Sequence, residues 1–117
     1  MLENDLKRLF LLEQPKVLPD LRLVNRVVGR FEIRDGATGR HRPVHVGIKG
    51  LCDLYGWRRG GHAVEVELKA YGGRMRPEQE KWRVWCLAWG IEHFLLTAGK
   101  SEEPMQTVKR WIEEVRA

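Results

Sequence analysis

The chain has 117 residues and carries 21 lysines and arginines against 16 aspartates and glutamates, a net charge of +5. A chain of this length can bury one core, so we expect residues 1–117 to form a single domain. It contains no apolar run of about eighteen residues and no charged-then-apolar leader, which argues against a membrane protein and predicts a cytoplasmic one. The excess of basic over acidic residues favours a polyanionic partner such as nucleic acid.

The thiol and imidazole side chains do not indicate a zinc site. Cys52 and Cys86 lie far apart without a Cys-x-x-Cys spacing, so we expect free thiols in a reducing compartment. His41 and His45 are close in sequence, but a proline between them excludes the helix that would align them as metal ligands. The other two histidines are isolated, and we interpret them as structural.

An amphipathic helix is predicted at the start of the chain. Leucines and a phenylalanine recur at helical spacing through residues 2–13, with charged residues between them. Pro15 and Pro19 are expected to end this helix. Glu3 lies in its first turn, where the positive end of the helix dipole favours an acidic side chain.

Residues 22–34 alternate between charged and apolar side chains, which favours a strand. A turn at residues 35–39 leads to a partner strand over residues 43–48. The outward arginines and the basic residues of the partner segment form a predicted ridge for phosphates, which includes Arg26, Arg30, Arg42 and Lys49. The alternative is a solvated strand edge that is kept charged against aggregation.

The most informative stretch is residues 50–79. Residues 64–69 alternate between apolar and charged side chains, and a strand would turn Glu65, Glu67 and Lys69 to one face. Asp53 precedes this strand by a glycine-rich segment that predicts a hairpin. Such a hairpin can bring Asp53 beside Glu67.

Carboxylates gathered in this way repel each other. Two like charges about 4 Å apart cost roughly 4 kcal/mol at an effective dielectric of about 20. Lys69 offsets only one of these charges, so a divalent cation held by oxygen atoms is the expected relief. Mg²⁺ is the usual choice where one or two carboxylates act together with substrate phosphates.

An aspartate followed on the next strand by Glu-x-Lys resembles the PD-(D/E)XK nucleases. More narrowly, residues 22–90 look like the VRR-NUC domain, the virus-type replication-repair nuclease domain. The matching features are Gly-x-x-Asp-Leu-x-Gly around Asp53, a Gly-Gly hairpin, Glu67-x-Lys69-Ala, a second Gly-Gly pair and a Pro-Glu-Gln that ends at Gln79. This resemblance implies an α/β fold with a restriction-endonuclease-like core, a mixed four- to five-stranded sheet flanked by helices.

The resemblance also implies the chemistry of the site. The groups implied to hold Mg²⁺ or Mn²⁺ are the side chains of Asp53, Glu67 and Glu3 and the backbone carbonyl of Leu68. Lys69 would orient the attacking water or stabilise the transition state, and Gln79 would hold that water or the Lys69 amine. The implied protein is a homodimeric DNA endonuclease, structure-specific on branched DNA such as Holliday junctions, in a bacterial cell and of phage origin.

The role of Glu65 has two interpretations. It shares the face of Glu67 but lies about 7 Å away along the strand. We favour the rim carboxylate of an exposed strand end over a ligand for a second ion.

A basic loop and a second helix are predicted next. Pro77 fits the first position of a helix that should run to about residue 89. Arg76 stands where the resembled family usually has Ser or Thr, so we expect no side-chain cap there. Four arginines of this loop and of the preceding hairpin turn are further candidates for contact with a nucleic-acid backbone: Arg58, Arg59, Arg74 and Arg76.

Trp82, Trp85 and Trp89 recur on one face of this helix. We expect this face to pack in the core, and the alternative is an interface with a second subunit. A closing strand over residues 91–97 and an amphipathic helix over residues 105–115 complete the predicted fold.

Two other functions compete with the nuclease. A non-cleaving basic nucleic-acid-binding module would keep the basic surface, but clustered acids near phosphates are of no use to it. A basic protein-interaction or inhibitory domain would bind no DNA even at low salt.

Overall fold

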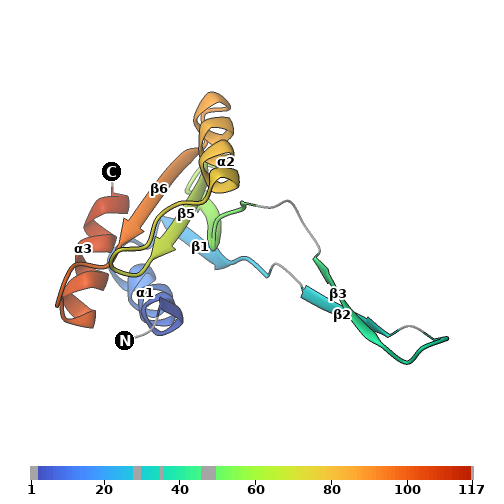
Figure 1. Cartoon of the computed structure of the whole chain (residues 1–117). Coiled ribbons are helices and arrows are strands. Elements are labelled where there is room, and N and C mark those ends of the chain that lie inside the picture. Colours follow the sequence, from blue (N-terminus) through green and yellow to red (C-terminus); the bar gives the residue numbers. More distant parts are fainter. Residues whose placement is uncertain (1–2, 28–29, 35, 46–49, 117) are drawn as a thin grey trace.

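The computed structural model describes residues 3–27, 30–34, 36–45 and 50–116, with the backbone alone for residues 30–33 and 42–45. Helices cover both faces of a four-stranded sheet (Figure 1). α1 (Glu3–Val17) and α3 (Pro104–Arg116) pack together on one face, and α2 (Pro77–Ala88) lies on the other. The predicted α/β arrangement is confirmed at this level. No described helix is long and apolar enough to cross a membrane.

The four-stranded sheet is mixed, as expected. Its strand order is β1 (Leu21–Asn25), β4 (Leu54–Arg58), β5 (Ala63–Lys69) and β6 (Glu92–Thr97). β4 runs antiparallel to both of its neighbours, whereas β5 and β6 are parallel. A parallel pair needs a crossover connection, and α2 supplies it. β5 therefore lies inside the sheet, and its residues 64–68 are all buried.

One face of the sheet forms the apolar core. Val64, Val66 and Leu68 of β5 belong to the same buried cluster as Phe10 of α1 and Trp111 of α3. The two rings meet edge to face, with their centroids 5.8 Å apart. Because successive strand residues point to opposite faces, the charged residues of β5 are left facing α2.

α1 continues past Pro15, so the expected end of the helix is wrong. The helix runs to Val17 with the proline inside its last turn. A proline removes one amide donor and crowds the preceding turn. After this end the buried side chain of Gln14 holds the chain that leads into β1, because its Nε2 donates to the carbonyls of Leu18 and Leu21 at 2.8 and 2.9 Å.

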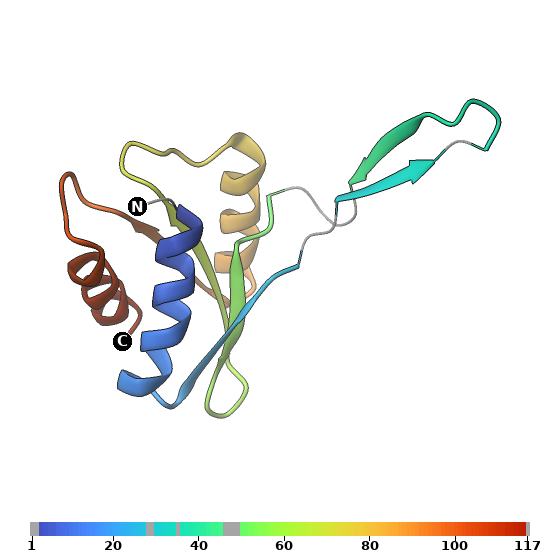
Figure 2. The same ribbon diagram turned by 90° about the horizontal axis from the view of Figure 1, so that it is seen from below.

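The single strand predicted over residues 22–34 is also wrong, because two strands in different sheets occupy it. β2 (Arg30–Arg34) pairs with β3 (His41–His45) in a separate two-stranded sheet. β3 begins before the predicted strand 43–48, and residues 46–48 lie outside the described residues. Figures 1 and 2 show this hairpin standing away from the rest of the molecule, and we call residues 30–45 the arm.

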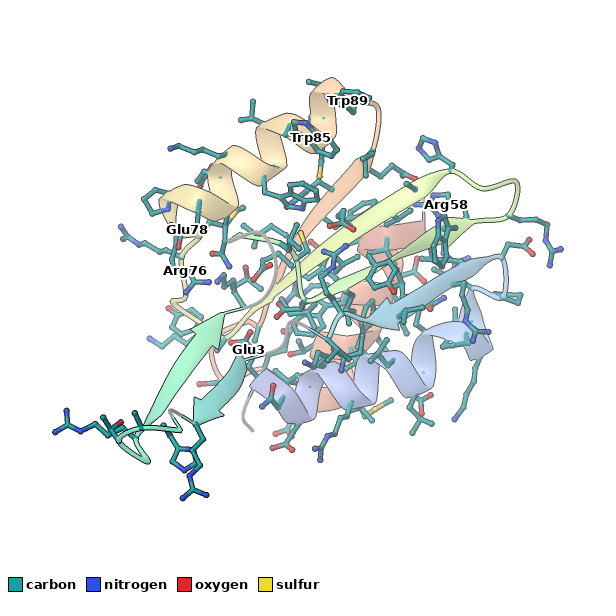
Figure 3. The ribbon with its side chains drawn as sticks, turned by 90° about the vertical axis from the view of Figure 1, so that its right-hand side faces the viewer. Glu3, Arg58, Arg76, Glu78, Trp85 and Trp89 are labelled. Carbon is teal, nitrogen blue, oxygen red and sulfur yellow. The ribbon has the colours of Figure 1, made fainter. Side chains whose placement is uncertain are left out.

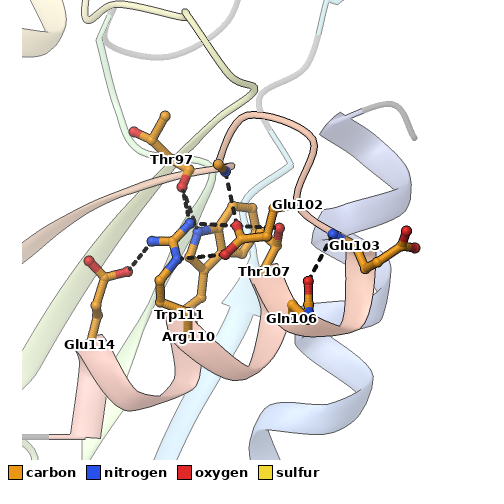
Figure 4. Close-up of polar contacts among 9 residues, drawn as sticks. Thr97, Glu102, Glu103, Gln106, Thr107, Arg110, Trp111 and Glu114 are labelled. Atoms are coloured by element: carbon orange, nitrogen blue, oxygen red, sulfur yellow. Dashed lines mark hydrogen bonds and ion pairs between the residues drawn. The ribbon is translucent and has the colours of Figure 1, made fainter.

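An ion-pair network fastens α3 to the end of β6 (Figure 4). Arg110 donates to both oxygens of Glu102, at 2.8 and 3.1 Å, and to the Thr97 carbonyl at 2.7 Å. The Thr107 hydroxyl donates to the same carboxylate at 2.6 Å. Hydrogen bonds from Arg110 and then Thr107 lower the pKa of Glu102 to about 2.

Candidate active site

The β4–β5 hairpin brings Asp53 and Glu67 together. Leu54 pairs with Val66, so the next position along the ladder sets Asp53 against Glu67. One Asp53 oxygen accepts a hydrogen bond from the Leu68 amide at 3.0 Å. This bond satisfies a backbone donor beyond the end of β4 and fixes the Asp53 side chain at the end of β5.

Glu67 is the more deeply buried member of the pair. It is 3% exposed, and its Oε2 has no hydrogen-bond partner among the described residues. Burial and then the charge of Asp53 raise the pKa of Glu67 to about 7, although Lys69 opposes this shift. Since a buried carboxylate oxygen without a partner is costly, a proton or a cation is the usual compensation.

Gln79 connects α2 to the other side chains of the site. Its Nε2 donates to Glu67 Oε1 at 3.0 Å, and its Oε1 accepts from Lys69 Nζ at 3.0 Å. Lys69 Nζ also lies 3.4 Å from Glu67 Oε1. The structure thus places Gln79 against the Lys69 amine, one of the two positions expected for it.

The start of α2 is fitted closely to the strand ends. Arg76 makes no side-chain cap, and its backbone amide instead donates to Gln79 Oε1 at 2.8 Å. Gly50 has a φ of +91°, and a Cβ there would overlap the Glu78 carbonyl. Only glycine tolerates both the positive φ and the close approach to the Glu78 carbonyl. Gly50 therefore allows the loop that carries Asp53 to approach α2.

The donor set at this point fits Mg²⁺ or Mn²⁺. The amide and carbonyl of a strand residue point to the same edge, so the Leu68 carbonyl faces the side on which Asp53 lies. Two carboxylates and a carbonyl are hard oxygen ligands of the kind these ions take. Within the described ranges no group of three or more His, Cys, Asp and Glu side chains is placed to hold a metal. Glu3, at the start of α1 in Figure 3, is therefore not brought to the pair.

Glu65 is not the rim carboxylate that we favoured. It is buried, and its two oxygens accept from the Arg26 guanidinium at 2.7 and 2.9 Å. Trp82 Nε1 donates to the same carboxylate at 2.9 Å. The expectation is wrong because β5 is an interior strand whose charged face is covered by α2. Since both oxygens are already engaged, we do not assign Glu65 to an ion.

Arg26 does not point outward into a basic ridge, as was predicted. Its guanidinium lies 4.6 Å from the centre of the Tyr55 ring and donates to the Cys52 carbonyl at 3.1 Å. Its backbone amide donates to the Asp53 carbonyl at 2.9 Å. The prediction is wrong because this face of β1 is covered: Arg26 continues the β1–β4 register opposite Asp53 and lies on the face that Tyr55 and Glu65 share. Arg26 therefore holds the chain around Asp53 in place.

Two predicted phosphate-binding arginines lie far from the carboxylates. Arg58 donates to Glu92 at 2.7 and 3.0 Å, and Arg59 donates to Asp20 at 2.7 Å. Both lie at the hairpin end of β4, whereas Asp53 precedes its other end. The structure does not bring these arginines to the candidate site.

The other predicted basic residues divide into two groups. Arg74 and Arg76 are exposed in the loop that leads into α2, close in sequence to Gln79. The side chains of Arg30 and Arg42 and the whole of Lys49 lie outside the described residues. Among the described residues of this set, Arg74 and Arg76 are therefore the ones that precede Gln79 in the loop leading into α2.

The α2 tryptophans form a partly exposed column instead of a core. The rings of Trp82 and Trp85 are stacked with centroids 4.8 Å apart, and those of Trp85 and Trp89 are 5.3 Å apart. Trp85 is 42% exposed and Trp89 71% exposed, toward the C-terminal end of α2 in Figure 3. The core prediction is wrong for these two residues because α2 buries only the side that carries Gln79 and Cys86.

A buried thiol–imidazole contact was missed by sequence reasoning. Cys52 Sγ lies 3.2 Å from His93 Nε2, and both side chains are buried. Burial raises the pKa of Cys52 and lowers the pKa of His93, so both groups stay neutral at pH 7. Only the pairing of β5 with β6, which sets Glu65 opposite His93, brings the histidine to this place.

Comparison with known proteins does not identify the chain. It matches no protein-family model, no curated protein and no solved structure. Its function therefore has to be argued from the site itself, two adjacent carboxylates beside a lysine that a glutamine holds in place.

Proposed function

We propose that this protein is a metal-dependent DNA endonuclease whose site consists of Asp53, Glu67, Lys69 and Gln79. The observation that carries the proposal is the buried Glu67 oxygen without a described partner, next to a second carboxylate. Buried polar atoms in folded proteins are normally paired, so an unpaired one calls for an explanation such as an ion. Oxygen ligands beside a lysine amine are suited to phosphodiester hydrolysis.

Each side chain has a separate role in this proposal. Asp53, Glu67 and the Leu68 carbonyl would hold Mg²⁺ or Mn²⁺, which stabilises negative charge on a phosphate and lowers the pKa of water. Lys69 adds a second positive charge for the transition state. Gln79 holds the Lys69 amine, and its own orientation is fixed by the Arg76 amide.

We further infer that the substrate is branched DNA and that the working form is a homodimer. The net charge of +5 supports a nucleic-acid partner. The resemblance of residues 22–90 to VRR-NUC domains supports a branched substrate and a phage-encoded protein in a bacterial cell. Two sites related by a two-fold axis suit the cutting of two symmetry-related strands.

The test is a panel of labelled four-way junction, duplex and single-stranded DNA incubated with Mg²⁺, Mn²⁺ or EDTA. We expect cleavage of the junction with either metal and none in EDTA. Asp53→Asn, Glu67→Gln and Lys69→Ala should abolish cleavage, and the two acid variants should bind DNA as well as the wild type or more tightly. Glu103→Gln, which alters an exposed acid of the loop before α3, is the control and should cut normally.

The rival functions give different results in the same panel. Intact substrates with tight binding would identify a non-cleaving nucleic-acid-binding module, and no binding at low salt would identify a protein-interaction domain. Unchanged cutting by both acid variants would show that other carboxylates hold the metal. Titration calorimetry with Mn²⁺ gives an independent measure, since Asp53→Asn should lose the binding signal.

A further inference from the structure

We propose that the tryptophan column of α2, Trp82, Trp85 and Trp89, is a stacking site for unpaired nucleobases. This inference rests on the proposed function, because that function makes the ligand a nucleic acid. Its own evidence comes from a different surface of the molecule. It identifies the preferred substrate as DNA with an unpaired segment near the cleaved bond.

The column has one open end. Its rings are nearly parallel, with interplanar angles of 13° and 25° for the two successive pairs. Trp85 has a tryptophan ring on each side, whereas the described residues place one ring against Trp89, which is 71% exposed. A nucleobase is also a flat aromatic ring, so it can extend the column on the outer face of Trp89.

The charges around the column favour a polyanion over a second copy of the chain. Four exposed basic residues lie in and just before α2, at Arg74, Arg76, Lys81 and Arg83, against two acidic residues, Glu78 and Glu80. Glu78 is paired with Arg76 at 3.5 Å, so the remaining charges of this segment are three basic and one acidic. A two-fold contact would press two copies of this basic surface together. Phosphates beside the stacked bases would instead neutralise it.

The column leads away from the carboxylate pair. Trp82 donates to Glu65 at 2.9 Å and lies one helical turn after Gln79. Trp89 lies about 15 Å farther along α2 than Gln79, at about 1.5 Å per residue. A strand that runs from the carboxylates along α2 therefore reaches Trp89 a few nucleotides from the cleaved bond, at the position of a tail, a gap or a branch point.

The test compares two DNAs in EDTA, a duplex with a short single-stranded thymidine tail and the same duplex with blunt ends. We expect Trp89→Ala to bind the tailed DNA about tenfold more weakly and the blunt DNA unchanged, because stacking on an aromatic side chain acts only on unpaired bases. Trp89→Phe should keep most of the affinity. Leu87→Ser, a control at another exposed position of α2, should bind both DNAs normally. Tailed DNA should also quench the tryptophan fluorescence of the wild type more than that of Trp89→Ala.

Several outcomes would overturn the stacking site. Equal weakening on both DNAs, or no weakening on the tailed DNA, contradicts it. If Trp89→Ala converts a dimer to a monomer in light scattering, Leu87→Ser does not, and tailed-DNA affinity per chain is unchanged, the column is an interface between copies. The nuclease proposal can fail separately. Trp89-dependent binding without metal-dependent cleavage would reject only the enzymatic activity. Metal-dependent cleavage without an effect of Trp89 on binding would reject only the stacking site.

Discussion

Among single residues, the buried Glu67 makes folding sensitive to pH. Its pKa is about 7 in the folded protein against 4.5 ordinarily, so between these values the folded state binds more protons than the unfolded state. Stability is therefore lost as the pH rises through this range. In EDTA we expect Glu67→Gln to be about 2–3 kcal/mol more stable than the wild type near about pH 8, and similar to it near about pH 5. Urea unfolding at the two pH values measures the difference.

Titrating groups that do not interact with Glu67 cancel in this comparison. Burial lowers the pKa of His93, which acts in the opposite direction, but it does so in both proteins. Glu102→Gln is a control of opposite sign, since the pKa of Glu102 is about 2 and its ionised form stabilises the fold at neutral pH. Parallel pH curves for Glu67→Gln and the wild type would contradict a raised pKa. Mg²⁺ should stabilise the wild type at high pH and leave the variant unchanged.

The Arg26–Glu65 pair gives a prediction about stability. Its side chains are 17% and 7% exposed, so removing one partner leaves a nearly buried charge unpaired. We expect Arg26→Ala to lose about 3 kcal/mol, and Arg26→Ala with Glu65→Gln to lose less than Arg26→Ala alone. A double-mutant cycle in urea checks this. Additive losses would show that the two residues do not act as a pair.

The site and this pair differ in how well the sequence predicts them. Asp53, Glu67 and Lys69 lie on one short hairpin, where alternation and turn glycines fix the geometry locally, and Gln79 follows on the next helix. Arg26 meets Glu65 across 39 positions. The alternation of apolar and charged residues does not indicate that β1 pairs with β4. The contact between Arg26 and Glu65 therefore could not be predicted from the sequence.

At the scale of elements, the exposed arginines of the arm give a test of the proposed DNA binding. Arg34 and Arg40 are exposed near the turn of the arm. If they contact phosphates, replacing both by Ala should reduce the slope of log affinity against log salt by about two, equally for all sequences. The control pair is Arg59 and Arg116, exposed arginines already paired with Asp20 and Glu113. An unchanged slope, or a loss confined to one sequence, would exclude the phosphate role.

The helices and strands show why hydrophobic periodicity alone misplaced some of their boundaries. Periodicity identified the three helices and most strands of the described residues, since it reports local conformation. Periodicity does not show which strand pairs with which. For this reason β1 and β2, which belong to different sheets, were predicted as one strand. Periodicity also did not report what covers a helix face, so the exposed tryptophans of α2 were assigned to the core. The end of α1 was misplaced because a proline was taken to stop the helix, whereas α1 contains Pro15 in its last turn.

For the whole molecule, the arm determines the overall dimensions. The radius of gyration is 16.4 Å and the principal extents are 53 × 35 × 26 Å, whereas a compact chain of this length has a radius of gyration of about 13 Å. The strands of the arm contact mainly each other, and an isolated hairpin contributes little stability of its own. The arm should therefore be removable without unfolding the rest.

Replacing residues 30–45 by a short glycine–serine linker tests this. In solution scattering we expect the radius of gyration to fall toward about 13 Å, while the urea midpoint stays close to that of the full chain. If the only role of the arm is to bind DNA, the variant without the arm should cleave DNA with an unchanged kcat and a higher KM. The reason is that the variant loses DNA contacts but keeps the carboxylate site. A lower urea midpoint would mean that the arm packs against the sheet and helices in solution. A lower kcat would mean that the arm also shapes the site around Asp53.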